Sequence, residues 1–358
     1  SVSVTDGGTE SAGTIFGGGS EIVYSGGLAT GTQVSSGGHL NVSSGGKLRG
    51  IDINGGSVVV HGGSIKGASV ESGGVLRINS GATEAGTSVG SGGYEFLMPG
   101  ADTASGGDTI ASGGTLVILS GASAGSYTSQ AGATIVSGGA WTVGTGASSS
   151  GLTLGIGDQG TVFGTTTGTV VSFGGFEYVS SGGLASASVI SAGGYETVYN
   201  SGTASGAIVS GSQNISAGGT TISSLVYGEL HVSASGTAIG TSVGLGGSEY
   251  LSGGTDSGTV VWVSGRQLVS SGGIASDTTI QSGGVQKVFA GGLAVGTTIS
   301  EGGLATVLDG GAATLDAILS GGEMDISSGG AATSGAVSAG GLLDVGSGGS
   351  ASVFYLSS

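Results

Sequence analysis

A unit of 19 residues repeats along almost the whole chain, and this repeat constrains the fold more than any other feature. The last 95 residues divide into five tandem copies, which begin at Ser264, Gly283, Gly302, Gly321 and Gly340. In all five copies position 6 is Val or Ile, positions 9 and 10 are Gly-Gly, position 12 is Ala, and position 17 is Ile, Val or Leu. A unit this short cannot bury its apolar side chains alone, so stacked copies must share one core.

The same unit continues upstream with small changes in length. Twelve further copies begin at Gly18, Gly37, Gly55, Gly73, Gly92, Gly113, Gly138, Gly174, Gly193, Ser210, Tyr227 and Gly246, and position 6 is aliphatic in each. The spacing slips only around Ala131–Phe173, where six extra residues follow the unit from Gly113 and a weak unit is expected near Gly160–Phe173. We therefore expect an N-terminal cap or partial rung at residues 1–17 and a single array at 18–358, irregular at 131–173.

Each unit holds two short runs rich in Val, Ile and Thr, separated by Gly-Gly pairs, as at Gln286–Phe289 and Thr297–Ser300. Runs this short favour strands, and glycine supplies the positive φ that tight corners need. Glycine is 86 of the 358 residues, which disfavours helices, while a single proline excludes collagen and the absence of cysteine excludes a disulfide scaffold. The sequence predicts an all-β protein, a right-handed parallel β-helix of about 18 rungs, with positions 6 and 17 forming internal ladders.

The charge balance and the motifs exclude several functions. Six Lys and Arg against 22 Asp and Glu give a net charge of −16, which argues against nucleic acid as a partner. The histidines His39, His61 and His231 do not converge in the array, and the repeat lacks the Gly-x-Asp of calcium-binding β-rolls. Asp158 lies in a Gly-rich stretch and is interpreted as a turn residue. We predict no catalytic, cofactor-binding or metal-binding residue.

Two repeated features are candidates for surface contacts. Position 4 holds a glutamate in five units, namely Glu21, Glu95, Glu177, Glu196 and Glu249. Strict alternation places position 4 on the same side as position 6, but a carboxylate is rarely buried unpaired, so we expect these side chains at a corner with solvated heads, as an acidic interaction face. A serine precedes Gly-Gly in many units, and together these serines form a row of hydroxyls. The candidates for modification are Ser25, Ser36, Ser72, Ser271, Ser282, Ser320 and Ser328.

The repeat resembles the AIDA-type repeat of self-associating autotransporter adhesin passenger domains. Gly283–Glu301 and Ser264–Ser282 match it best, and the resemblance covers Gly18–Ser358. It implies a right-handed β-helix on the surface of a Gram-negative cell, anchored to the outer membrane through a C-terminal β-barrel that this sequence does not include. It also implies auto-aggregation, biofilm formation or host-cell adhesion, and O-linked heptose on serines of the repeat.

From the residues and the resemblance together we expect a non-enzymatic adhesin that binds through its long polar face. Its expected partner is a copy of itself on a neighbouring cell, with host surface glycans or proteins as further partners. Three alternatives stay open: a polysaccharide-active β-helix enzyme or phage tailspike, which needs clustered carboxylates in a groove beside 131–173; a passive structural stalk; and, remotely, an ice-binding β-helix.

Overall fold

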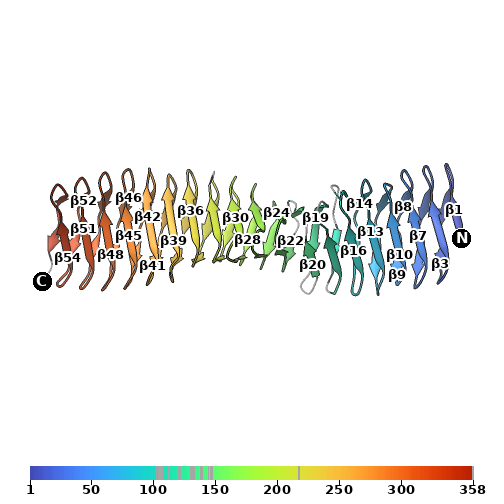
Figure 1. Cartoon of the computed structure of the whole chain (residues 1–358), viewed down its shortest axis with the longest axis horizontal. Coiled ribbons are helices and arrows are strands. Elements are labelled where there is room, and N and C mark those ends of the chain that lie inside the picture. The colour runs from blue at the N-terminus through green and yellow to red at the C-terminus, as the bar shows by residue number, and fades with distance from the viewer. Residues whose placement is uncertain are drawn as a thin grey trace. The chain divides into compact units, whose positions relative to one another are not determined.

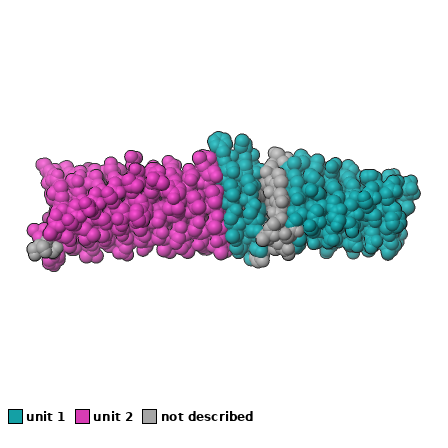
Figure 2. All heavy atoms as spheres, turned by 90° about the horizontal axis from the view of Figure 1, so that it is seen from below, with its two compact units in different colours: residues 1–177 teal, residues 178–358 magenta. Residues whose placement is uncertain are grey.

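The computed structural model describes residues 1–356 except 102, 104–107, 112, 120–121, 130–133, 138–139, 144, 146–147 and 217. It divides into two compact units, unit 1 at residues 1–177 and unit 2 at residues 178–358 (Figure 2). All regular structure in the described residues is β, in about 17 turns of parallel strands (Figure 1). Accordingly, these residues hold no helix of the length and apolarity that crossing a membrane requires. The predicted all-β parallel β-helix is confirmed, while the single array over 18–358 stays a prediction.

Unit 1 is built from parallel strands that stack in three sets. The first set is β1 (Val2–Val4), β4 (Ser20–Val23), β7 (His39–Val42), β10 (Ser57–Val60), β13 (Val75–Ile78), β16 (Tyr94–Leu97), β18 (Thr115–Ile118) and β20 (Thr134–Ser137). The second set is β2 (Thr9–Ser11), β5 (Leu28–Thr30), β8 (Lys47–Arg49), β11 (Ser64–Lys66) and β14 (Thr83–Ala85). The third begins with β3 (Thr14–Ile15), β6 (Gln33–Ser35), β9 (Asp52–Asn54), β12 (Ser69–Glu71), β15 (Ser88–Val89), β17 (Asp108–Ile110) and β19 (Ser123–Ser129).

The predicted irregular stretch contains one extra strand. β20 pairs with β18, while β19 pairs with β17 through Tyr127–Ser129 and with β21 through Ser123–Ser126. The four-residue strands thus leave the first set after β20 and continue from β19 as β21 and β24. The strands after β20 are β21 (Ala140–Val143), β22 (Ser148–Ser150), β23 (Thr153–Leu154), β24 (Gln159–Val162), β25 (Thr165–Thr167) and β26 (Val170–Val171), and β27 (Phe176–Val179) contains the division between the units. Residues 131–133, 138–139, 144 and 146–147 of this stretch lie outside the described residues.

Unit 2 repeats three strands per turn without interruption. Its long-strand sheet is β30 (Tyr195–Val198), β33 (Ser212–Ile215), β36 (Glu229–Ser233), β39 (Ser248–Ser252), β42 (Arg266–Ser270), β45 (Val285–Val288), β48 (Leu304–Val307), β51 (Glu323–Ile326) and β54 (Leu342–Val345). A second sheet is β28 (Leu184–Ser186), β31 (Thr203–Ser205), β34 (Thr220–Ile222), β37 (Thr237–Ile239), β40 (Thr255–Ser257), β43 (Ile274–Ser276), β46 (Leu293–Val295), β49 (Ala312–Thr314), β52 (Ala331–Thr333) and β55 (Ser350–Ser352). The third is β29 (Val189–Ile190), β32 (Ile208–Val209), β35 (Leu225–Val226), β38 (Ser242–Val243), β41 (Val260–Val261), β44 (Thr279–Ile280), β47 (Thr298–Ile299), β50 (Ala317–Ile318), β53 (Ala336–Val337) and β56 (Tyr355–Leu356).

The predicted internal ladders are confirmed in both units. Position 6 is fully buried from turn to turn, as at Val23 and Val42 in unit 1 and Val269 in unit 2, and position 17 is buried at Ile280 and Ile299. The register keeps like residues together, because Val269 pairs with Val288 and Ile280 with Ile299. In the last turn the corresponding side chains, Val345 and Leu356, are exposed, since no following turn of this sequence covers them.

The two glycines of a corner serve different purposes. Gly291 adopts a φ of +74°, a left-handed conformation that costs a residue with a Cβ about 1–2 kcal/mol. Gly292 has no room for a Cβ, because that atom would lie 2.3 Å from the carbonyl oxygen of Val269 in the preceding turn. Close stacking of the turns, rather than the sharpness of the corner, therefore requires the second glycine.

We expect Gly292→Ala to lower the free energy of unfolding by about 2–4 kcal/mol, because backbone of the preceding turn must shift to admit the methyl group. Gly291→Ser should cost only about 1–2 kcal/mol, because it adds the left-handed strain without a backbone clash, and Ser201 and Ser235 occupy the same corner position with φ of 64° and 63°. Chemical denaturation of the two variants measures the difference. Equal losses would show that the backbone contact beneath Gly292 is unimportant.

Candidate interaction surfaces

The five position-4 glutamates lie inside the β-helix, so the predicted acidic interaction face is wrong. Their side chains are at most 3% exposed, and the set is Glu21, Glu95, Glu177, Glu196 and Glu249. On β39 the buried Glu249 and Leu251 flank the outward Tyr250, so position 4 follows the strict alternation of a strand. The corner placement was expected because burying a carboxylate costs free energy. Positions 4 and 6 lie on one short strand, however, so their side chains must point to the same side, which is the interior.

In unit 2 the buried glutamate belongs to a hydrogen-bonded group of polar side chains. Nε2 of Gln267 donates to Glu249 and to Asp256, both at 2.9 Å, and Thr259 donates to Asp256 at 2.7 Å. Burial raises the pKa of Asp256 to about 6. Burial, followed by the negative charge of Asp256, raises the pKa of Glu249 well above its ordinary value. Around this pair Leu230, Ala238 and Ala275 face inward, whereas Glu229, His231 and Arg266 face outward on the adjoining strands.

Unit 1 holds a second group of buried acids. Thr87 donates its hydroxyl to Glu84 at 2.5 Å and its backbone N–H to Asp108 at 2.9 Å. Burial and the charge of Asp108 raise the pKa of Glu84 to about 8. Neither carboxyl oxygen of Glu95 has a hydrogen-bond partner among the described residues, and burial with the charges of Glu84 and Asp108 raises its pKa well above the ordinary range. No group of three or more His, Cys, Asp or Glu in the described part of the chain is arranged to hold a metal ion.

No cation shares the interior with these acids. All six lysines and arginines are exposed, namely Lys47, Arg49, Lys66, Arg77, Arg266 and Lys287. A buried carboxylate without a counter-charge is strongly destabilised relative to its neutral acid. The folded chain therefore holds protons on its interior carboxyls at pH values where the unfolded chain releases them.

The seven candidate serines all lie at exposed turn positions. Ser271 and Ser72, for example, adopt φ of 49° and 50° beside a glycine. The corner geometry leaves these hydroxyls accessible to an enzyme or a partner, and their modification stays a prediction.

The three histidines lie apart from one another, His39 on β7, His231 on β36 and His61 in the bend after β10, and Asp158 stabilises a turn. His61 contacts the side chain of Asn79 at 2.8 Å, His39 is exposed on β7, and His231 stacks on Tyr250 with ring centroids 4.7 Å apart. Asp158 is buried and accepts a hydrogen bond from the backbone N–H of Gly155 at 2.7 Å, which confirms the interpretation as a turn residue.

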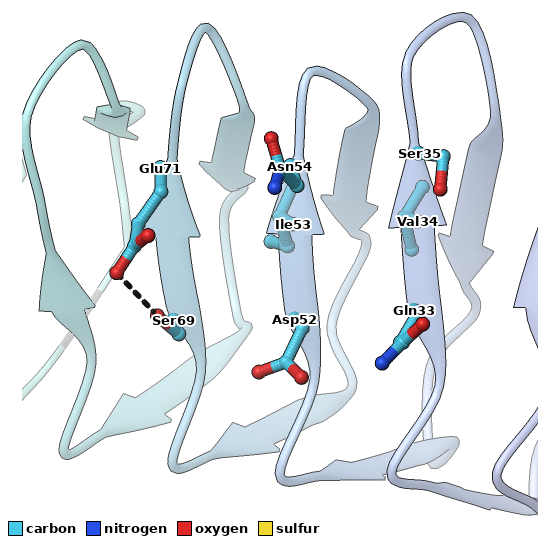
Figure 3. A pocket seen from close by; sticks show the side chains of 8 residues that line it. All are labelled: Gln33, Val34, Ser35, Asp52, Ile53, Asn54, Ser69 and Glu71. Carbon is cyan, nitrogen blue, oxygen red and sulfur yellow. Dashed lines mark hydrogen bonds between the residues drawn. The ribbon is translucent and has the colours of Figure 1, made fainter.

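A shallow polar hollow lies on the outer surface of β6, β9 and β12 in unit 1. Its volume is about 380 Å³, and Figure 3 shows Gln33, Asp52 and Ser69 in one row across the three strands. The next outward row is Ser35, Asn54 and Glu71. These amide, hydroxyl and carboxylate groups suit many weak hydrogen bonds to a polar partner, and they are not converged for catalysis.

The long-strand sheet of unit 2 carries an apolar strip on its outer surface. Tyr250, Leu268, Phe289 and Leu308 line a hollow of about 590 Å³. A neighbouring hollow of about 390 Å³ shares Leu268 and Phe289 and is bordered by Arg266 and Lys287. The strip is half-buried and differs from the Ser-rich and Gly-rich corners around it.

No protein-family model and no curated protein matches the chain. Among solved structures, the chain is similar to the TibC-catalysed, hyper-glycosylated TibA55-350 fragment. The two are 29% identical, the match covers 96% of this chain and 99% of that one, and the TM-score is 0.38.

Proposed function

We propose that this chain is a non-enzymatic adhesin of the autotransporter passenger type that binds copies of itself side by side at the cell surface. The repeat over Gly18–Ser358 supports the passenger type through its resemblance to AIDA-type repeats. The acid groups described above lie inside the β-helix instead of in a groove, which disfavours the polysaccharide-active alternative.

The regular outer surface of the sheets is the observation that best supports self-association. In the described part of the chain the short glycine corners raise no walls around a pocket, and outward side chains recur once per turn, about 4.8 Å apart. One hydrogen bond contributes about 1 kcal/mol or less, so a single contact is weak. Contacts repeated over many turns of one molecule add up to a stable association.

Sedimentation velocity of the purified, unmodified chain over a wide concentration range tests the proposal. We expect reversible dimers or larger species, and cells that display the chain should aggregate. A monomer at every concentration, together with cells that stay dispersed, would reject self-association and favour the passive stalk.

Host surface glycans or proteins as further partners, and O-linked heptose on the corner serines, belong to the same proposal. Intact-mass measurement of the chain isolated from its native surface tests the modification. Addition of heptose to Ser271 and its equivalents supports it, and an unmodified mass counts against it.

A further inference from the structure

The outward charges of unit 2 are arranged in blocks along its long-strand sheet. Arg266 on β42 and Lys287 on β45 are the only Lys or Arg between residues 178 and 358. Both are exposed, and no acidic group among the described residues forms a salt bridge with either. Two turns beyond Lys287, the half-buried carboxylates of Glu323 and Asp325 lie on β51.

The pairing register places these charges in matching columns. One outward row runs through Arg266, Val285, Leu304 and Glu323, and the next runs through Leu268, Lys287, Thr306 and Asp325. Between β42 and β51 each row therefore holds one cation and one anion, with apolar or hydroxyl side chains between them. Beyond this segment each row has one more acid, Glu229 two turns before Arg266 and Asp344 one turn after Asp325. With turns about 4.8 Å apart, the centres of the cationic and anionic blocks are separated by about 12 Å.

We propose that this sheet binds the same sheet of a second copy, antiparallel, so that the block of cations on β42 and β45 of each copy faces the acidic end of the sheet, at β51, of the other. The inference rests on the proposed self-association and deepens it by naming the contact. The two copies are related by a two-fold axis that lies in the interface, parallel to the strands and between β45 and β48. This axis makes the turns of the second copy run in the opposite order, and each outward row faces the same row of the other copy. Arg266 then lies opposite Glu323 twice per dimer, and Lys287 lies opposite Thr306, one turn away from Asp325 of the other copy.

The apolar strip fits the centre of this arrangement. Phe289 and Leu304 lie on or next to β45 and β48, so their counterparts from both copies meet close to the axis. Burying them supplies the affinity, while the flanking charges fix the register and the orientation. If the two β-helices instead ran parallel, related by a two-fold axis along their length, the cations of one copy would lie near the cations of the other.

The test uses paired charge reversals in the full chain at low salt. Variant A carries Arg266→Glu and Lys287→Glu, and variant B carries Glu323→Lys and Asp325→Lys. Each variant alone should associate about tenfold more weakly or worse, because like charges then face each other. An equimolar mixture of A and B should regain wild-type association, because opposite charges meet again at both ends. The matched control is Lys47→Glu with Lys66→Glu, which makes the same change in net charge on exposed residues of unit 1.

The outcomes separate this contact from self-association in general. If the wild type associates and variant A associates equally well, the contact is overturned while self-association stands. If A and B are both weakened but their mixture is not restored, the antiparallel register is overturned. If the wild type does not associate, the proposed function fails and the contact fails with it. Thermal unfolding of A and B close to the wild type confirms that the variants are folded.

Discussion

Raising the pH from about 5 to about 9 should lower the free energy of unfolding of this chain by several kcal/mol. Burial raises the pKa of Asp316 from 3.8 to about 7 and that of Glu84 from 4.5 to about 8. A carboxyl whose pKa is raised on folding contributes its full stability below its unfolded pKa, and this stability is lost as the pH rises through the folded pKa. Between about pH 5 and its folded pKa of about 7, Asp316 alone then accounts for a loss of about 3 kcal/mol, at about 1.4 kcal/mol per pH unit.

Urea unfolding at several pH values measures this profile. Repulsion among the surface charges of a chain with net charge −16 also grows with pH, so the series is repeated at high salt. Salt screens the surface charges and leaves the interior carboxyls unaffected, so the decline should persist. A stability that is flat between the two pH values would show that the interior acids are not held as neutral groups.

Replacing Glu95 by leucine should stabilise the chain, although it removes a buried polar group. Glu95 pairs with Leu76 on one side and Leu116 on the other, so the column is already lined by leucine. Its two carboxyl oxygens have no hydrogen-bond partner among the described residues. At about pH 8, Glu95→Leu should raise the free energy of unfolding by about 2–4 kcal/mol, because apolar contact replaces a desolvated acid.

The matched control is Glu71→Leu, a change of the same kind at an exposed glutamate on β12. It should alter stability by less than about 0.5 kcal/mol. The gain from Glu95→Leu should shrink as the pH is lowered, because the protonated acid is less costly to bury. Destabilisation by Glu95→Leu at every pH would mean that the carboxyl has a structural role.

The ladders and the glycine corners were predictable from the sequence because each follows from one repeated position. Val269 and Ile280 recur as aliphatic residues at a fixed spacing, and only the interior explains that pattern. The strand alternation that buries Val269 also buries the side chain at position 4. The sequence alternation could therefore have predicted the buried glutamates. The opposing argument, that a carboxylate avoids the interior, concerns an average cost and not the geometry of a four-residue strand.

The polar interior could not be predicted, because its partners come from different sheets and different turns. Gln267 reaches Glu249 one turn earlier and Asp256 on another sheet, 18 and 11 residues away in the chain. Neither separation is a recognisable motif without the three-sided turn. The charged rows were not predicted for the same reason, since Arg266 shares a row with Glu323, and Lys287 with Asp325, only when the turns are stacked in register.

The single strand β20 gives this architecture an economical way to vary. Inserting one strand leaves every later hydrogen-bonded stack intact, yet within unit 1 the four-residue strands from β21 onward form a different wall from those of β1–β20. Within unit 1 the insertion therefore changes the exterior, since the outward residues of β21 and β24 lie on the wall that β19 continues and not on the wall of β1–β20. One added strand at a corner can thus change which wall carries the four-residue strands while the turns keep their parallel stacking.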